Sequence, residues 1–267
     1  MPETYIQPGR RSRECRHWWF DHWDRLVNGA LGLAGAPTIE LECGEIAIDT
    51  HVHTLFSHCS INQPEVIIRW AVKIGLNGIC IMDHNDTRGI EDAQRCADFL
   101  KESEAIPEGF LIIPGVEINA DRGHVGGMFM RAPAPVGMTP RDTVKAIHDE
   151  GGLAVAVHPY HSTGIRDAVF DAEFDAVEVE CGSVFGTELV SRNRKLDADP
   201  RLAGVTKLGS SDAHYVRALA SCYTVLKPQT VTLDGIRQAI LDGKSSPRVS
   251  APCRRMRSLL GGIRKLK

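Results

Sequence analysis

The chain has 267 residues, of which 43% are hydrophobic and 24% charged, and its formal net charge is −3 at pH 7. This composition is typical of a soluble protein with one medium-sized domain, and it shows no excess of positive charge that would indicate a nucleic-acid-binding or membrane-binding protein. The sequence contains no apolar signal segment and no run of eighteen apolar residues, so we expect no membrane span and a cytoplasmic location. Its eight cysteines include no C-x-x-C pair, and we expect buried thiols rather than a disulfide framework or a zinc ribbon.

Residues 1–44 are predicted to form a helical extension rich in aromatic residues. The segment "CRHWWFDHWDRL" contains three tryptophans and a phenylalanine within a short helical pattern. His17 and His22 in this segment could suggest a ligand-binding helix. A helix that docks on the main domain through partly buried aromatic side chains is the favoured interpretation.

Residues 45–246 alternate between short apolar runs and amphipathic helical stretches. This order predicts a parallel sheet with crossover helices, and the nearly continuous Ile, Val, Ala and Leu content predicts strands that are covered on both faces. A closed or nearly closed α/β barrel is the simplest architecture. Helices are expected from Pro64, Gly89 and Thr139 and near Glu188, because Pro suits a first helical turn and Thr-Pro suits an N-cap followed by N1. The predicted strands are "IAIDT", "NGICIMD", "FLIIPGVEI", "HVGGMFM", "GLAVAVH", "AVEVEC" and "VTKLGSSD".

Residues 247–267 carry many arginines and lysines and no acidic residue. Such a segment could contact an anionic surface. A solvated or loosely docked tail is the favoured prediction.

Side chains that commonly bind metals follow the predicted strands in a regular way. In a parallel barrel the carboxyl ends of the strands meet on one face, where functional sites are built. Burying several ionisable groups together costs free energy, and bound cations can offset that cost. The residues at the ends of five strands and the start of one are His51, His53, Asp83, His84, Glu117, His124, His158, Asp212 and His214.

The spacing within two of these groups also favours metal binding. In His51-x-His53 and Asp212-x-His214 the two side chains point to the same side of an extended strand, so each pair can bind one ion. Several imidazoles with few carboxylates suit Zn²⁺, Mn²⁺ or Fe²⁺ rather than Mg²⁺ or Ca²⁺. So many potential ligands predict more than one divalent metal ion.

Six motifs in this order resemble the PHP (polymerase and histidinol phosphatase) family from about Ile46 to Lys244. They are "DTHVHTLFSHCS", "IMDHND", "PGVEI", "GHVGGMF", "AVHPY" and "GSSDAH". The resemblance implies a distorted (β/α)₇, TIM-barrel-like fold whose di- or trinuclear metal centre hydrolyses phosphate esters through a metal-bridging hydroxide. It implies one metal bound by His51, His53, Glu117 and Asp212, a second by Glu117, His124 and His158, and a third by His84 and His214, with His58 as a further candidate ligand.

The sequence departs from the family pattern after the H-x-H motif, where many members carry S-D-G and this chain carries Ser57-His58-Cys59. Some members place a histidine near this point in a trinuclear site, so His58 is expected to bind the third metal. Cys59 is interpreted as a bystander rather than a reactive thiol or an extra ligand. Asp49 and Asp83 are expected to hydrogen-bond the ligand histidines and fix their tautomers.

The remaining catalytic roles are assigned by position. His214 or His161 is the candidate for donating a proton to the leaving oxygen, and Asp212 is expected to contribute to catalysis as well as to metal binding. Arginines in the loops above the strands are candidates for binding phosphate oxygens, although surface arginines explain each position equally well. These arginines are Arg166, Arg192, Arg194 and Arg217.

A small phosphorylated molecule, either a phosphomonoester or a phosphodiester, is the expected substrate, and no long nucleic acid is expected. Two alternatives stay open. One is an amidohydrolase-like C–N hydrolase, which the H-x-H pair would also suit, although no lysine stands at a central strand end to form a carbamylated bridge. The other is a non-catalytic accessory metal domain. The sequence does not predict the substrate's identity or the oligomeric state.

Overall fold

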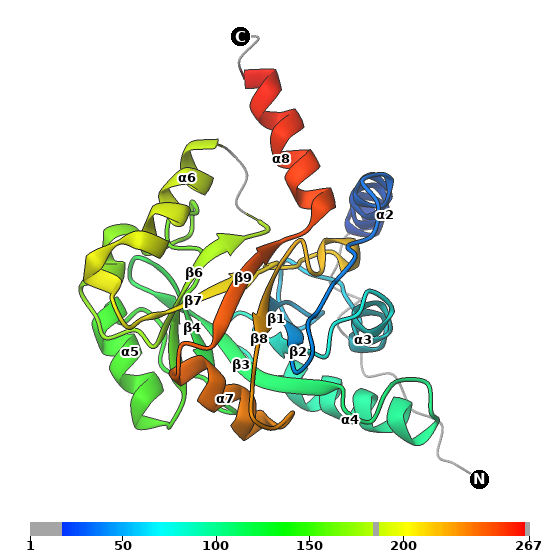
Figure 1. Ribbon diagram of the computed structural model, residues 1–267, viewed down its shortest axis with the longest axis horizontal. Helices are drawn as coiled ribbons and strands as arrows, with labels where there is room; N and C mark the ends of the chain where they lie inside the picture. Colours follow the sequence, from blue (N-terminus) through cyan, green and yellow to red (C-terminus); the bar gives the residue numbers. More distant parts are fainter. Residues whose placement is uncertain (1–17, 184–186, 265–267) are drawn as a thin grey trace.

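A single nine-stranded sheet forms the centre of the protein. The computed structural model describes residues 18–183 and 187–264. The strand order is β7-β6-β5-β4-β3-β2-β1-β8-β9, and the sheet curves into a nearly closed barrel (Figure 1). The strands are β1 (Ile46–Val52), β2 (Gly78–Ile81), β3 (Leu111–Ala120), β4 (Gly123–Met128), β5 (Leu153–Ala156), β6 (Ala176–Cys181), β7 (Thr206–Ser210), β8 (Cys222–Leu226) and β9 (Ser245–Val249).

The sheet is mixed, whereas the sequence predicts a parallel one. Strands β1, β2 and β3 are parallel, as are β5, β6 and β7, but β4 is antiparallel to both of its neighbours. Only Asp121 and Arg122 separate β3 from β4, and so short a turn can join only antiparallel strands. Strands β8 and β9, which the sequence analysis did not identify, add antiparallel pairs next to β1.

The two edges of the sheet come together at β7, β8 and β9. The Thr224 hydroxyl donates to the Gly209 carbonyl at 2.7 Å, and the Ser245 hydroxyl donates to the Lys207 carbonyl at 2.8 Å. Gly209 permits this approach, because a Cβ atom at its position would lie 2.5 Å from the Tyr223 carbonyl oxygen. The barrel therefore closes through side-chain hydrogen bonds where the strand ladder ends.

Helices cover the outside of the barrel, and all of those named below except α7 lie at positions that the sequence predicts. Pro64 stands in the first turn of its helix, and the Thr139 hydroxyl accepts from the Asp142 amide at 3.2 Å as an N-cap. The helices are α3 (Pro64–Lys73), α4 (Arg88–Glu102), α5 (Pro140–Asp149), α6 (Thr187–Lys195) and α7 (Leu233–Leu241), and the 3₁₀ turns are η1 (Arg166–Phe170), η2 (Leu196–Ala198), η3 (Pro200–Leu202) and η4 (Val216–Ala218).

The core has one layer inside the barrel and others beneath the helices. Ile48 and Ile113 lie in the barrel interior, whereas Ile67 of α3 packs against the sheet from outside. Every residue of β1 is buried, as expected for a strand that is covered on both faces. Each fully buried aliphatic side chain contributes about 1.5–3 kcal/mol to folding, so this core holds the strand ends rigidly in place.

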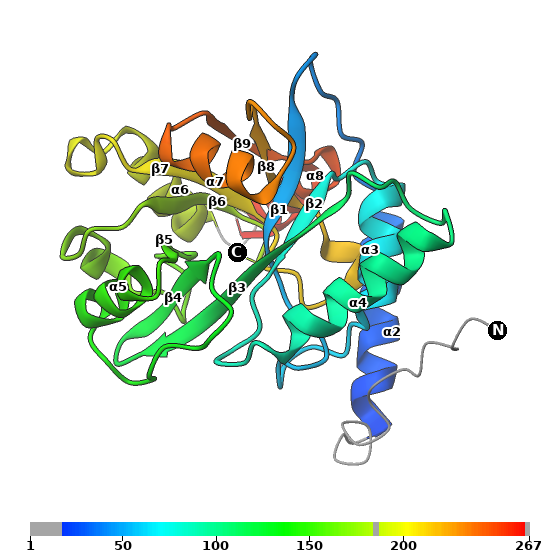
Figure 2. The ribbon, with the colours of Figure 1, turned by 90° about the horizontal axis from the view of Figure 1, so that it is seen from below.

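Helix α2 (Trp18–Leu33) is the expected N-terminal helix, and it lies on the same side as α3 and α4 (Figure 2). The Trp23 indole donates to the Tyr215 hydroxyl at 3.1 Å, and Asn28 accepts from the Arg217 amide at 2.9 Å. His22 is exposed on this helix, while His17 and the rest of residues 1–17 lie outside the described residues.

The C-terminal segment is not the loose tail that its composition predicts. Residues up to Val249 belong to β9, and helix α8 (Ala251–Arg264) extends outward from the barrel (Figure 1). Its Cys253 side chain is buried, and Arg257 pairs with Glu180 at 2.7 Å. Arg257, one of the basic residues of this segment, therefore has a structural role.

Within the described residues, no helix is both long and apolar enough to cross a bilayer.

Candidate metal centre

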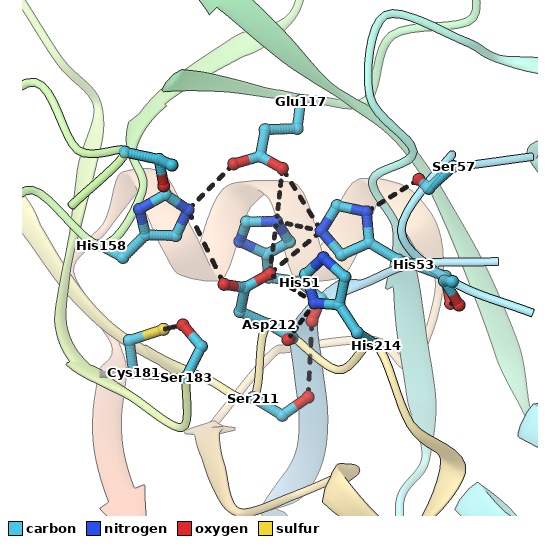
Figure 3. A network of polar contacts seen from close by, with 12 residues as sticks. His51, His53, Ser57, Glu117, His158, Cys181, Ser183, Ser211, Asp212 and His214 are labelled. Carbon is cyan, nitrogen blue, oxygen red and sulfur yellow. Dashed lines mark hydrogen bonds and ion pairs between the residues drawn. The ribbon is translucent and has the colours of Figure 1, made fainter. Parts of the chain in front are cut away.

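The potential ligands meet at the carboxyl-terminal face of the barrel (Figure 3). His51 lies near the end of β1 and Glu117 near the end of β3, while His158 and Asp212 lie just beyond β5 and β7. His51, Glu117 and His158 are at most 1% exposed, and Asp212 is 6% exposed. One atom from each lies within 4.8 Å of the other three. The predicted convergence of the strand ends is therefore found.

The Glu117 carboxylate divides the surrounding histidines into two groups. Its Oε1 lies 2.7 Å from His124 Nδ1 and 2.9 Å from His158 Nε2. Its Oε2 lies 3.4 Å from His51 Nε2 and 3.3 Å from His53 Nε2. Glu117 therefore stands between two sets of imidazole nitrogens, as a bridging carboxylate must.

Asp212 completes the side occupied by His51 and His53. Its Oδ1 lies 3.0 Å from His53 Nε2 and 3.5 Å from His51 Nε2, and its Oδ2 lies 3.8 Å from His158 Nε2. The Nε2 atoms of His51 and His53 face one another at 3.1 Å. Two neutral imidazoles can place two lone pairs this close when a cation lies beside both, which is the usual arrangement of a metal-binding H-x-H pair.

The charges in this cluster are strongly coupled. Burial lowers the pKa of His53, but the carboxylates of Asp212 and Glu117 outweigh it and raise that pKa to about 9. Burial likewise opposes ionisation of Glu117, yet the neighbouring His51 and hydrogen bonds from His124 and His158 hold its pKa well below the usual range. Without a bound cation, protonated histidines compensate the buried carboxylates.

The outer histidines behave differently. Burial lowers the pKa of His84 to about 3 despite the nearby Glu117, and burial together with the charge of His53 lowers the pKa of His214 to about 4. Both rings are therefore neutral at pH 7, and each has a nitrogen lone pair that can bind a metal. His84 forms one cluster with Glu117 and His124 and another with His53, Cys59 and His214.

The structure does not support His58 as a ligand. Its side chain is exposed, and among the described residues it joins no group of three or more potential ligands. Its ring lies 5.2 Å from that of His84, measured between centroids. The adjacent Cys59, which sequence reasoning treated as a bystander, lies within ligand distance of the cluster instead.

Two site residues have positive φ angles, a backbone conformation that is unfavourable for residues with a Cβ atom. His158 has φ of 28° and Asp212 has φ of 51°. Each residue follows a strand and points its side chain back over the barrel mouth. Such strained residues persist only where the surrounding structure holds them in place, and they are concentrated at functional sites.

A buried acid that sequence reasoning missed holds two of the ligands. Glu178 on β6 is 1% exposed, and its Oε1 lies 3.1 Å from His51 Nδ1 while its Oε2 accepts from the His158 amide at 2.7 Å. The signal for it was an acidic residue within the apolar run "AVEVEC". Glu178 has the role of fixing a tautomer that was predicted for Asp49.

Asp49 and Asp83 act on the backbone and on hydroxyl groups. Asp49 accepts from the Ser211 and Ala220 amides, each at 2.9 Å, so it ties β1 to the loops after β7 and does not contact an imidazole ring. Asp83 accepts from the Ser57 hydroxyl at 2.5 Å, and Ser57 Oγ lies 2.9 Å from His53 Nδ1. Asp83 therefore orients His53 indirectly.

Of the four candidate arginines, Arg166 lies beside the cluster. It lines a cavity of about 640 Å³ that also contacts His124. Arg192 stacks over the Tyr160 ring at 4.3 Å, and Arg194 pairs with Glu180. Arg217 stacks over Trp70 of α3 at 3.9 Å. These contacts give Arg194 and Arg217 structural roles, so position after a strand was an insufficient criterion for phosphate binding.

His161 lies next to the cluster without joining it. Its ring centroid is 5.3 Å from that of His158, and the Thr163 amide donates to His161 Nδ1 at 3.4 Å. Burial and the charge of His158 lower the pKa of His161. Because Nδ1 accepts a hydrogen bond, the proton of the neutral ring resides on Nε2.

The arrangement of donors fits divalent cations. Glu117 Oε2 and His84 Nδ1 are buried 3.1 Å apart, and neither makes a well-directed hydrogen bond in the described part of the chain, although Oε2 also faces the Nε2 atoms of His51 and His53. A buried carboxylate oxygen held by ion-pair contacts without a directed hydrogen bond is a favourable position for a cation. Imidazole nitrogens with two carboxylates match the preferences of Zn²⁺, Mn²⁺ and Fe²⁺. The site can therefore hold divalent metal ions.

Comparisons with known sequences identify the family. A family model described as PHP domain matches residues 49–187, and one described as PHP-associated matches residues 200–245. An uncharacterized protein of Methanocaldococcus jannaschii is 32% identical over 143 residues, which cover 49% of this chain and 79% of that protein. A second uncharacterized protein of this organism is 23% identical over 186 residues, covering 66% of this chain and 68% of the relative.

Solved structures share the fold at low sequence identity. A two-domain protein of Bacteroides vulgatus, described as containing a predicted PHP-like metal-dependent phosphoesterase, has a TM-score of 0.61 at 18% identity, covering 81% of this chain and 68% of that chain. The lesion-specific endonuclease EndoQ of Pyrococcus furiosus has a TM-score of 0.55 at 17% identity, covering 76% of this chain and 57% of that chain. The PHP domain match alone spans more than half of the sequence. The chain therefore belongs to the PHP domain family.

Proposed function

We propose that this protein is a metal-dependent hydrolase of phosphate esters. The observation that carries the proposal is the shared Glu117 carboxylate, with His124 and His158 on its Oε1 side and His51 and His53 on its Oε2 side. One cation on each side of Glu117 would form a dinuclear centre. Bound divalent cations would act as Lewis acids toward two phosphoryl oxygens and activate water for attack on phosphorus.

The protein's own residues prepare the ligand atoms for this role. A carboxylate accepts hydrogen bonds, so the Glu178 contact to His51 Nδ1 places the ring proton there and leaves the Nε2 lone pair facing the site. The Asp83–Ser57 pair contacts His53 Nδ1 and fixes its ring in the same orientation. Both histidines therefore present Nε2 toward Glu117 and Asp212.

We assign hydrogen-bond donation to the leaving oxygen to His161 rather than to His214. His214 belongs to a group of potential ligands, whereas His161 carries a proton on Nε2 beside the site. From this position, the neutral His161 ring can donate an Nε2–H hydrogen bond to the oxygen of the leaving group as the ester bond breaks, and the attacking water supplies the proton that this oxygen takes up. Asp212 then serves as a ligand and as the anchor for His53.

The surroundings support a small substrate. The cavity beside His124 has a volume of about 640 Å³, which is within the range of small-molecule sites. Arg166 lines this cavity, and its guanidinium can donate two hydrogen bonds to a phosphate group. The net charge of −3 disfavours a long polyanion. The substrate class that fits best is a small phosphomonoester or phosphodiester.

Metal analysis combined with a phosphoester panel tests the proposal. We expect at least two divalent ions per chain after reconstitution, together with hydrolysis of an aryl phosphate or bis-aryl phosphate. Asp212→Asn should lower kcat by about 100-fold or more, equivalent to about 2.7 kcal/mol of lost transition-state stabilisation. Asp242→Asn is the matched control, because Asp242 pairs with Lys244 on the surface.

Three outcomes would contradict parts of the proposal. A wild-type chain that binds less than one metal after reconstitution and cleaves no phosphoester would remove its basis. Full activity of Asp212→Asn would exclude Asp212 as a catalytic ligand. Preferential cleavage of a duplex oligonucleotide over every small ester would replace the substrate class while leaving the phosphoesterase chemistry intact.

A further inference from the structure

A thiol lies within one of the groups of histidines that could hold a metal ion. One ligand atom from each of His53, Cys59, His84 and His214 lies within 4.8 Å of the other three. Cys59 is partly buried, whereas its neighbour His58 is exposed. The loop after the H-x-H motif therefore brings a sulfur atom, and not the expected imidazole, to these histidines.

His53 is already used by the first group of ligands. Its Nε2 lies 3.0 Å from Asp212 Oδ1, and its Nδ1 lies 2.9 Å from Ser57 Oγ. Both nitrogens of this ring have partners, so His53 is not available as a ligand for a further cation. The other members of its group are Cys59, His84 and His214.

The two remaining imidazoles have lone pairs to offer. His214 Nδ1 lies 2.9 Å from the Asp212 carbonyl oxygen, which can only accept. The ring proton is therefore on Nδ1, and Nε2 keeps its lone pair. The His84 side chain is 10% exposed, its Nδ1 lies 3.1 Å from Glu117 Oε2, and a nitrogen of this ring lies within 4.8 Å of ligand atoms of Cys59 and His214. Both rings are thus prepared for a cation.

We propose that Cys59, His84 and His214 bind a third divalent cation, with Cys59 as a thiolate ligand. Binding replaces the thiol proton: Cys59–SH and M²⁺ give a Cys59–S–M bond and release one H⁺. One thiolate and two neutral imidazoles form a softer donor set than the carboxylate-rich first site, so this position favours Zn²⁺ over Mn²⁺. Three protein ligands leave a fourth tetrahedral position open, as in catalytic zinc sites.

This inference deepens the proposed function, because the third cation would belong to the same centre and face the same substrate. The geometry requires only a small adjustment. Ligand atoms around a tetrahedral zinc ion lie roughly 3.5 Å apart, and the upper limit of their separations here is 4.8 Å. Rotation of the partly buried Cys59 side chain can supply that closure.

Cobalt reconstitution of the full chain tests the proposal directly. Co²⁺ bound by a thiolate shows a charge-transfer absorption in the near ultraviolet that imidazole and carboxylate ligands do not produce. We expect this band in the wild type together with three equivalents of metal. Cys59→Ser should lose the band and one equivalent while retaining the other two. His58→Ala should keep the band and all three equivalents. Cys43→Ser, which changes an exposed free cysteine, controls for nonspecific thiol binding.

A wild-type spectrum without the thiolate band would overturn the inference, and this measurement does not depend on the folding of any variant. Persistence of the band in Cys59→Ser, or loss of one equivalent in His58→Ala, would also overturn it. Failure of the proposed function is distinguishable: the wild type would then show the thiolate band but cleave no phosphoester.

Discussion

Replacing Glu178 by glutamine should weaken metal binding although Glu178 is not itself a ligand. The carboxylate accepts a hydrogen bond from His51 Nδ1 at 3.1 Å and another from the His158 amide at 2.7 Å. It therefore joins a histidine on the Oε2 side of Glu117 to one on the Oε1 side. Glutamine preserves the size of the side chain but supplies only one accepting oxygen.

Either orientation of the new amide is unfavourable. If its oxygen accepts from the His158 amide, its NH₂ group faces His51 Nδ1 and favours the tautomer with the proton on Nε2. That proton would occupy the lone pair that faces His53 and Glu117. In the opposite orientation, two N–H groups meet at His158. Loss of such a supporting contact typically costs about 10–100-fold in metal affinity, or about 1.4–2.7 kcal/mol.

Competition with a metal-sensitive dye measures the affinity, and inductively coupled plasma mass spectrometry gives the metal content. Glu180→Gln is the matched control, because Glu180 lies on the same strand but pairs with Arg194 and Arg257. This control should change thermal stability without changing metal affinity. Wild-type metal affinity in Glu178→Gln, measured over pH 6 to pH 9, would refute the assigned role.

Two further predictions concern stability. In the metal-free chain, against the effect of burial, the carboxylates of Asp212 and Glu117 raise the pKa of His53 from 6.5 to about 9. The protonated ring therefore stabilises the fold fully below about pH 6.5, and about 3 kcal/mol is lost as the pH rises through 9. Urea unfolding at pH 6.5 and pH 9.5 with chelator should show this loss, and a pH-independent stability would contradict it. Gly89→Ala should lower the free energy of unfolding by about 1–3 kcal/mol, because the new Cβ would collide with the Asp83 carboxylate that orients Ser57. Gly109→Ala, which has open space around it, controls for the loss of a glycine, and equal melting temperatures of the two variants would exclude the collision.

The sequence was sufficient to predict seven of the strands, six of which carry potential ligands, because each is a short apolar run bounded by polar or turn residues. It was insufficient for β9, whose "SSPRV" sequence is largely polar and only partly buried. The direction of β4 depends on a two-residue turn rather than on any apolar pattern. Apolar periodicity identifies a strand, but connection length and edge pairing determine its direction and partner.

Prediction of the site was limited by the orientation of individual side chains. His51 and Asp212 follow strands whose direction fixes where they point, and both lie in the cluster as expected. His58 and Cys59 are neighbours in a loop, so the conformation of that loop decides which one faces the histidines. An acid within an apolar strand is a signal of a buried polar role, and this signal could have identified Glu178. Glu180 on the same strand is accounted for by its arginine partners.

Helix α2 has a consequence for how the domain is delimited. Trp23 and Asn28 bind the turn around Tyr215 and Arg217, which begins directly after the Asp212–His214 pair. This helix lies before residue 49, where the family match begins. A segment outside the family-matched region therefore hydrogen-bonds to the turn that directly follows two of the potential ligands. A chain shortened to the matched region would lose both of these hydrogen bonds to the turn that follows Asp212 and His214.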